Sequence, residues 1–252
     1  MLPYWLAPLV LAPFAGSFLG VLVRRLPRGE DVVLDRSRCE ACGLALGARD
    51  MVPVVSYLAL GGRCRRCRAP IAPMHLGVEL AAPGIALWAA LAAPGPARLW
   101  LSCGLGWTLL ALAWVDWEHF RLPDALTLPL VLAGLGATWL LDPGAMPEHA
   151  AAAALGYLAF RGIALGYRAL RGRDGMGAGD AKLLAAAGAW VGAAALPGVV
   201  LGAALAGLGL ALALRLSGRR VTRATAVPFG PPLCAALWLT WLYGSIEGGA
   251  GL

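Results

Sequence analysis

Long apolar runs alternate with short polar segments along almost the whole chain. Six runs have the roughly 17–25 residues that a helix needs to cross a bilayer. They fall near residues 3–23, 76–95, 99–116, 124–141, 149–168 and 197–214. Two shorter runs fall near 181–195 and 231–247, and glycine interrupts the first of them. The pattern therefore predicts an all-α polytopic membrane protein with about eight transmembrane helices, of which 181–195 is broken or tilted.

Composition supports the membrane class. Of the 252 residues, 60% are hydrophobic and 14% are charged, against roughly 25% charged in a typical soluble domain, and the mean hydropathy is 0.72. The net charge of +7 could indicate nucleic acid as a partner, but the basic residues lie in loops between the apolar runs. We therefore expect a lipid bilayer as the partner and no nucleic acid. No basic residue precedes the first run, so it is expected to be a retained helix rather than a cleaved signal peptide.

The basic residues gather in alternate loops, which predicts an orientation. If the N-terminus is outside, then loop 24–75, Arg121, region 161–182 and loop 215–230 lie inside, and of all Lys and Arg only Arg98 lies outside. Positive charge marks the cytoplasmic side of a membrane protein. We therefore expect both termini outside and these loops in the cytoplasm.

The chain is expected to have three parts. Residues 1–23 form the first transmembrane helix, 24–75 a cytoplasmic loop, and 76–252 a seven-helix membrane domain. Loop 24–75 is too short to bury a core of its own, because chains of this size usually need a metal or disulfides.

Four cysteines in this loop provide the chemistry for a metal. The stretches 39-CEAC-42 and 64-CRRC-67 each place two thiols about one turn apart, so the four can surround zinc as in zinc ribbons. Disulfides or unused thiols are the alternatives, and a reducing cytoplasm disfavours the disulfides. We expect Cys39, Cys42, Cys64 and Cys67 to bind a structural zinc. Cys103 and Cys234 lie alone in apolar runs and are expected to be core residues.

Two acidic stretches interrupt the apolar pattern. They are 115-VDWEHFRLPD-124 and 175-GMGAGDAKLL-184. On the predicted topology, Asp116 and Asp180 lie at the cytoplasmic ends of their helices and share a membrane depth. Two neighbouring carboxylates hold one proton between them, so one can take a proton from water while the other polarises a peptide carbonyl. The alternatives are a helix that simply meets water and, for the glycines, an anion cradle, whose usual spacing is missing.

Three other polar residues have simpler interpretations. Glu79, inside the second run, is expected to face the bundle interior and to make a structural hydrogen bond. Asp124 belongs to a solvated loop or caps the helix that follows it. Lys182 extends to the interface or acts on a nearby carboxylate.

Several motifs, in order, carry a resemblance to a known family. Besides the two aspartate stretches and the cysteines, they are 16-GSFLGVLVRRLP-27, 51-MVPVVSYLALGGRCRRC-67 with 78-VEL-80, and 227-VPFGPPL-233. The chain resembles the prepilin peptidases, the type IV leader peptidase family of GxGD-type intramembrane aspartic proteases. The resemblance covers nearly the whole length.

The resemblance implies two activities at the bacterial inner membrane. One cleaves the short basic leader of type IV prepilins and type II secretion pseudopilins on the cytoplasmic side, with Asp116 and Asp180 as catalytic residues. The other methylates the new N-terminus with S-adenosylmethionine, for which we find no nucleotide motif in the sequence. Two other classes remain: a transporter or channel that uses the aspartates as ion or proton sites, and a scaffold whose zinc loop binds partners.

Overall fold

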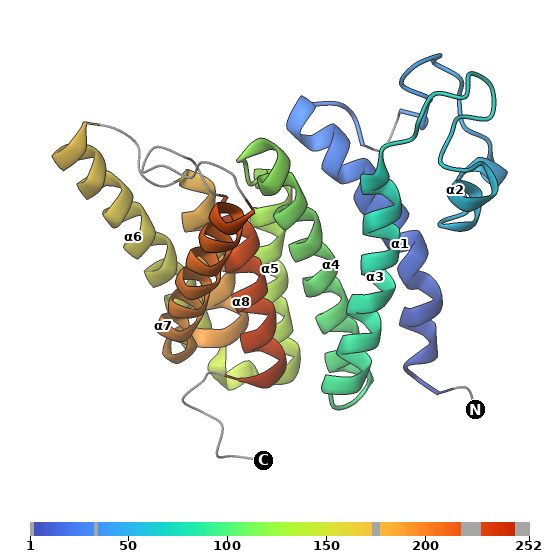
Figure 1. Cartoon of the computed structure of the whole chain (residues 1–252). Coiled ribbons are helices and arrows are strands. Elements are labelled where there is room, and N and C mark those ends of the chain that lie inside the picture. Colours follow the sequence, from blue (N-terminus) through green and yellow to red (C-terminus); the bar gives the residue numbers. More distant parts are fainter. Residues whose placement is uncertain (1–2, 33–34, 173–176, 218–227, 245–252) are drawn as a thin grey trace. The chain divides into compact units, whose positions relative to one another are not determined.

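A computed structural model of the chain describes residues 3–32, 35–172, 177–217 and 228–244 (Figure 1). Over these residues the regular secondary structure is helical, apart from two isolated β-bridges in the cysteine loop. The prediction of an all-α fold is confirmed.

Six helices among the described residues are long and apolar enough to cross a membrane. They are α1 (Leu6–Arg25), α3 (Pro73–Ala92), α4 (Pro96–His119), α5 (Asp124–Leu141), α6 (Met146–Arg171) and α7 (Ala178–Leu216). The shorter helices are α2 (Val55–Ala59), α8 (Gly230–Tyr243) and the 3-10 turns Leu26–Arg28, Ala48–Asp50 and Pro143–Ala145. The chain is therefore a multi-pass membrane protein.

The predicted runs 181–195 and 197–214 both belong to α7. This helix has 39 residues and a break at Gly192, where φ is 75° and ψ is 174°. The break lies within 181–195, as expected of a broken segment. Because this run and 197–214 form one helix and α8 is short, six helices among the described residues, and not the expected eight, qualify as spans. The run 231–247 corresponds to α8, which has 14 described residues.

The chain divides into two compact units, and the boundary falls inside α4, between Ala111 and Leu112. In the first unit α1 packs against α3. Gly16 makes this approach possible, because a Cβ there would lie 2.7 Å from the Cα of Glu79. Trp107 of α4 donates a hydrogen bond to the carbonyl of Ala82 at 3.0 Å.

In the second unit the first half of α7 is the centre of the core. It contacts α5, α6 and α8, and every residue of 183–190 is buried. Glycines let the helices approach closely, as small residues do in membrane bundles: a Cβ on Gly156 of α6 would lie 2.7 Å from the carbonyl oxygen of Leu184. Trp190 donates to the carbonyl of Leu130 at 2.9 Å and meets the ring of Trp241 edge-on.

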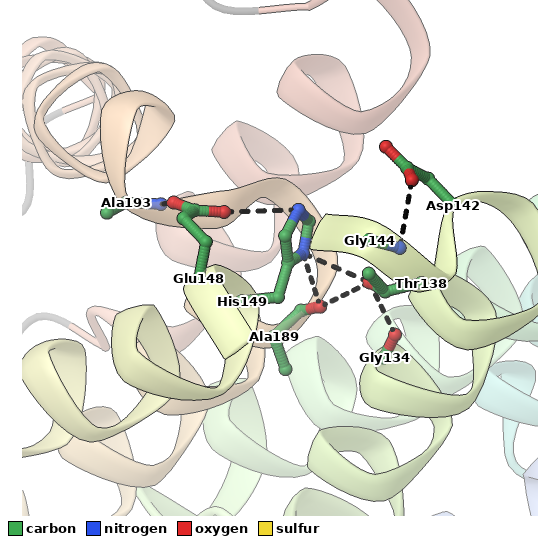
Figure 2. Close-up of polar contacts among 8 residues, drawn as sticks. All are labelled: Gly134, Thr138, Asp142, Gly144, Glu148, His149, Ala189 and Ala193. Carbon is green, nitrogen blue, oxygen red and sulfur yellow. Dashed lines mark hydrogen bonds and ion pairs between the residues drawn. The ribbon is translucent and has the colours of Figure 1, made fainter. Parts of the chain in front are cut away.

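Side chains of α5 and α6 satisfy the backbone groups that the break in α7 leaves unpaired (Figure 2). In an unbroken helix Ala193 N–H would bond to the carbonyl of Ala189. Here the N–H donates to Glu148 at 2.6 Å. The carbonyl lies 3.0 Å from Nδ1 of His149 and accepts a bond from the Thr138 hydroxyl at 3.3 Å. The carbonyl of the buried Ala189 and the N–H of the half-buried Ala193 thus both have partners, so the break is a supported feature of the fold.

Candidate active site and metal centre

Asp116 lies in the last turn of α4 and is buried, with 6% of its surface exposed. Its Oδ2 accepts a hydrogen bond of 2.8 Å from the backbone N–H of Gly230, the first residue of α8. The N-terminus of a helix carries a partial positive charge and favours a carboxylate. Asp116 is therefore a fixed, buried acid at the start of α8 and not a residue that simply meets water.

Asp180 lies in the first turn of α7 and is also buried, with 9% exposed. Its backbone N–H donates to the carbonyl of Gly177 at 3.2 Å. The carboxyl group interacts electrostatically with that of Asp116. The fold thus brings together the two predicted aspartates: Asp116 ends α4 and faces the N-terminus of α8, and Asp180 lies in the first turn of α7. Gly175 and Met176 of the second motif lie outside the described residues.

The start of α8 offers Asp116 a single backbone donor. Pro231 and Pro232 follow Gly230 and have no N–H. A Cβ on Gly230 would lie 2.7 Å from Oδ2 of Asp116, so only glycine permits this contact. The sequence analysis quoted 227-VPFGPPL-233 as a motif but missed this role of Gly230. The only signal in the sequence for this role was a glycine placed directly before two prolines.

Cys234 lies one turn after Gly230 on α8 and is buried, with 3% exposed. Burial agrees with the expectation of a core residue. Cys103 is fully buried, as expected.

The segment that joins α4 to α5 packs on the start of α7. A Cβ on Gly179 would lie 2.7 Å from Cβ of Leu122, so this glycine lets the connection lie against the helix that carries Asp180. Asp124 is the first residue of α5 and makes no cap hydrogen bond, since Pro123 occupies the N-cap position. It pairs instead with Lys182 at 2.5 Å, so the capping alternative was wrong.

The four cysteines of the loop form one cluster. The sulfur atoms of Cys39, Cys42, Cys64 and Cys67 all lie within 4.8 Å of one another, and those of Cys39 and Cys67 are 3.7 Å apart. Tetrahedral zinc with bonds of about 2.3 Å places sulfur atoms about 3.8 Å apart. The cluster could hold zinc, and four thiolates would leave no open position on the metal for catalysis.

Each Cys-x-x-Cys stretch forms the same small turn. Cys39 N–H bonds to the carbonyl of Leu44, and Cys64 N–H to that of Ala69, both at 2.8 Å. The residue after each second cysteine has a positive φ: 68° at Gly43 and 61° at Arg68. Backbone N–H groups point at the sulfur in the second turn, where those of Cys67 and then Arg66 lower the pKa of the Cys64 thiol to about 6. A thiol that ionises easily is a good metal ligand.

Glu79 ties the loop to α3. Its Oε2 accepts a hydrogen bond of 2.7 Å from the backbone N–H of Val54, which has a positive φ of 63°. The expected structural hydrogen bond is therefore present, and its donor comes from the loop.

The chain matches the sequence models of two protein families. The Bacterial Peptidase A24 N-terminal domain covers residues 10–93, and the Type IV leader peptidase family covers residues 103–212. No solved structure matches the chain significantly.

Curated relatives match over nearly the full length. A protein of Burkholderia pseudomallei is 39% identical over 94% of this chain and 84% of its own. Proteins of Dichelobacter nodosus and Pseudomonas aeruginosa are 36% and 34% identical, over 91% and 96% of this chain and 88% and 91% of theirs. All three are named prepilin leader peptidase/N-methyltransferase, which gives no support to the transporter alternative. The chain belongs to the type IV leader peptidase family.

Proposed function

We propose that the protein is an intramembrane aspartic endopeptidase of the bacterial inner membrane. It removes the leader peptide of type IV prepilins and type II secretion pseudopilins on the cytoplasmic side, with both termini of the chain outside. The observation that carries the proposal is the buried, electrostatically coupled pair of Asp116 and Asp180. Buried acids inside a membrane protein are costly and usually functional.

The pair supplies acid and base from two like groups. Because two neighbouring carboxylates do not both ionise at low cost, they share one proton. The ionised member takes a proton from the attacking water, and the protonated member donates to the carbonyl oxygen of the scissile peptide. The hydrogen bond from Gly230 fixes one oxygen of Asp116 and leaves the other for this exchange.

The cysteine cluster has a supporting role in the proposal. Cys39, Cys42, Cys64 and Cys67 would hold zinc, which supplies the folding free energy of a loop with little core. The metal takes no part in peptide hydrolysis.

The names of the relatives add a second reaction. We extend the proposal to methylation of the new N-terminal amine, with S-adenosylmethionine as the methyl donor. No residue of the chain is assigned to this step, which can be measured separately on a peptide that has already lost its leader.

Cleavage of a synthetic prepilin by membranes that contain the protein tests the proposal. Asp116→Asn and Asp180→Asn should each abolish cleavage while membrane insertion and zinc content stay unchanged. The double variant should be no worse than either single one, because residues that act as a unit are not lost twice. Cleavage near the wild-type rate by either single variant would exclude the aspartate pair. Ion flux through proteoliposomes, lost in the same variants, would instead support a transporter.

A further inference from the structure

The loop between α1 and α3 exposes a group of large apolar side chains. Met51, Val52, Val55 and Leu58 are 45%, 41%, 63% and 65% exposed. The other large apolar side chains that the structure describes in this loop are better covered. Comparable exposure occurs on the spanning helices, for example at Leu80 of α3, where lipid covers the surface. A group of exposed apolar side chains marks an interaction site.

The hydrogen bond between Val54 and Glu79 places this group beside a spanning helix. Glu79 is the seventh residue of α3, which begins at Pro73, so it lies about 9 Å along the helix at about 1.5 Å per residue. The 20 residues of α3 span about the thickness of the hydrocarbon core. The hydrogen bond therefore holds residues 51–58 beside the first third of this spanning helix, near the end at which it enters the bilayer, rather than far out in water.

Exposed arginines follow directly in the chain. Arg63, Arg66 and Arg68 are exposed, and no ion pair with a carboxylate is found for them within the described part of the chain. Arg65, by contrast, pairs with Asp50 at 2.7 Å. Arg63 donates a hydrogen bond of 3.4 Å to the backbone carbonyl of Arg68, which leaves its charge uncompensated. The three arginines therefore offer positive charge to an anionic partner.

Backbone hydrogen bonds and one ion pair connect the segment of the apolar group to the segment of the arginines. The N–H of Gly62 bonds to the carbonyl of Tyr57 at 2.8 Å, and that of Gly61 to Leu58 at 3.1 Å. The ion pair of Arg65 with Asp50 connects the arginine segment to the residue directly before Met51. Apolar contact and positive charge are therefore presented together.

We propose that this surface docks on the anionic lipid headgroups of the leaflet that α3 enters. The lipid-docking surface consists of Met51, Val52, Val55, Leu58, Arg63, Arg66 and Arg68. The apolar side chains enter the interface, while the arginines bind headgroup phosphates, as basic and apolar residues do in interfacial segments. Each arginine near an anionic surface contributes about a fivefold preference. The leader peptide of the proposed substrate is basic, so like charge disfavours it as the occupant.

Photo-crosslinking of the full-length protein in lipid nanodiscs tests the docking. p-Benzoylphenylalanine is placed at Leu58, at Leu80 as a lipid-facing reference, and at the exposed Arg36 as a reference expected to face water. In nanodiscs that contain phosphatidylglycerol, the label at Leu58 should form lipid adducts, as should that at Leu80, and the label at Arg36 should not. With phosphatidylcholine alone, the yield at Leu58 should fall at least about threefold, while that at Leu80 stays the same.

Charge variants separate the contribution of the arginines. R63Q/R66Q/R68Q should lower the yield at Leu58 as much as phosphatidylcholine does, at unchanged zinc content. Arg66→Gln alone should lower it more than the matched Arg36→Gln. Three results would overturn the proposal: no lipid adduct at Leu58 when Leu80 gives one, equal yields in the two lipids, or crosslinks from Leu58 to a second copy of the chain. None of these measurements depends on the proposed peptidase activity.

Discussion

The backbone N–H of Gly230 donates a hydrogen bond of 2.8 Å to Oδ2 of Asp116, although 114 positions separate the two residues. The contact joins the end of α4 to the beginning of α8. It sets the direction of a buried carboxylate whose partner, Asp180, begins a third helix. In the proposed function Asp116 is a catalytic acid, and such a group must be held in its productive geometry by its surroundings, so Gly230 is a positioning residue of the proposed site.

Gly230→Ala should strongly reduce prepilin cleavage. The added Cβ would lie 2.7 Å from Oδ2 and 2.9 Å from Cγ of Asp116, so the carboxyl group has to move. A displacement of about 1 Å can lower a catalytic rate about 10²-fold. We expect a loss of that size in kcat, measured with a synthetic prepilin.

Gly209→Ala is the matched control for this substitution. A Cβ at Gly209 of α7 meets no atom within 4 Å, so the rate should not change. Equal activity of the two variants would mean that the contact between Gly230 and Asp116 does not orient the acid.

Moving the first aspartate by one residue should also inactivate the protein. One residue turns a helical side chain by about 100°, and in α4 Val115 is fully buried while Trp117 is 47% exposed. We predict that Asp116→Ala combined with Val115→Asp, or with Trp117→Asp, does not cleave prepilin although charge and depth are nearly conserved. Activity in either double variant would show that an acid at this depth is sufficient.

The helices could be predicted because each apolar run has the length of a span, and even the break in α7 had a local signal in glycine. The aspartates could be predicted because charge is rare in such runs. The bond between Gly230 and Asp116 could not be, since no local pattern reports a contact across 114 positions. For the same reason the sequence allowed Asp124 to be a helix cap, whereas its partner, Lys182, lies 58 positions away.

Loss of one cysteine ligand should release the metal and unfold the loop. Purified protein should carry about one zinc per chain, and Cys42→Ser should lose it. Structural zinc contributes about 10–16 kcal/mol of apparent binding free energy in zinc-finger peptides, which no other feature of the loop replaces. Zinc content and proteolysis of the loop measure the effect, with cleavage of prepilin reduced only in part.

Cys103→Ala serves as the control, because this thiol is buried in α4 outside the cluster. It should leave zinc content unchanged. Disulfides among the four loop cysteines, found after thiols are blocked during isolation, would contradict the metal site.

Substitution of the residue that follows the second cysteine should change zinc retention in opposite directions in the two cysteine turns. Arg68 has a φ of 61° and Gly43 a φ of 68°, a region that costs a residue with a side chain about 1–2 kcal/mol. Arg68→Gly should therefore make zinc harder to remove with a chelator, by about 1 kcal/mol. Gly43→Ala should make removal easier by a similar amount, since its Cβ meets no atom within 4 Å and only the backbone is strained.

Arg68→Ala distinguishes strain from the side chain. It removes the guanidinium but keeps the positive φ, so zinc retention should stay close to wild type. A gain in retention equal to that of Arg68→Gly would mean that the charge, and not the backbone, weakens the turn.

Glu148 should stabilise the membrane domain because its carboxylate accepts a hydrogen bond at the break in α7. Glu148 accepts a hydrogen bond from the backbone N–H of Ala193 at 2.6 Å. Because Glu148 is 52% exposed and Ala193 is half-buried, Glu148→Ala should cost about 1 kcal/mol, the net value of one hydrogen bond. Glu148→Gln keeps a carbonyl oxygen as acceptor, so most of the stability should remain. Thermal unfolding in detergent measures both variants.

Gly192→Ala should be as damaging as Glu148→Ala. The added Cβ would lie 2.9 Å from Oε2 of Glu148, and Gly192 has a φ of 75°, which strains a residue with a side chain. Equal stability of all three variants and the wild type would mean that the break needs no support from α6.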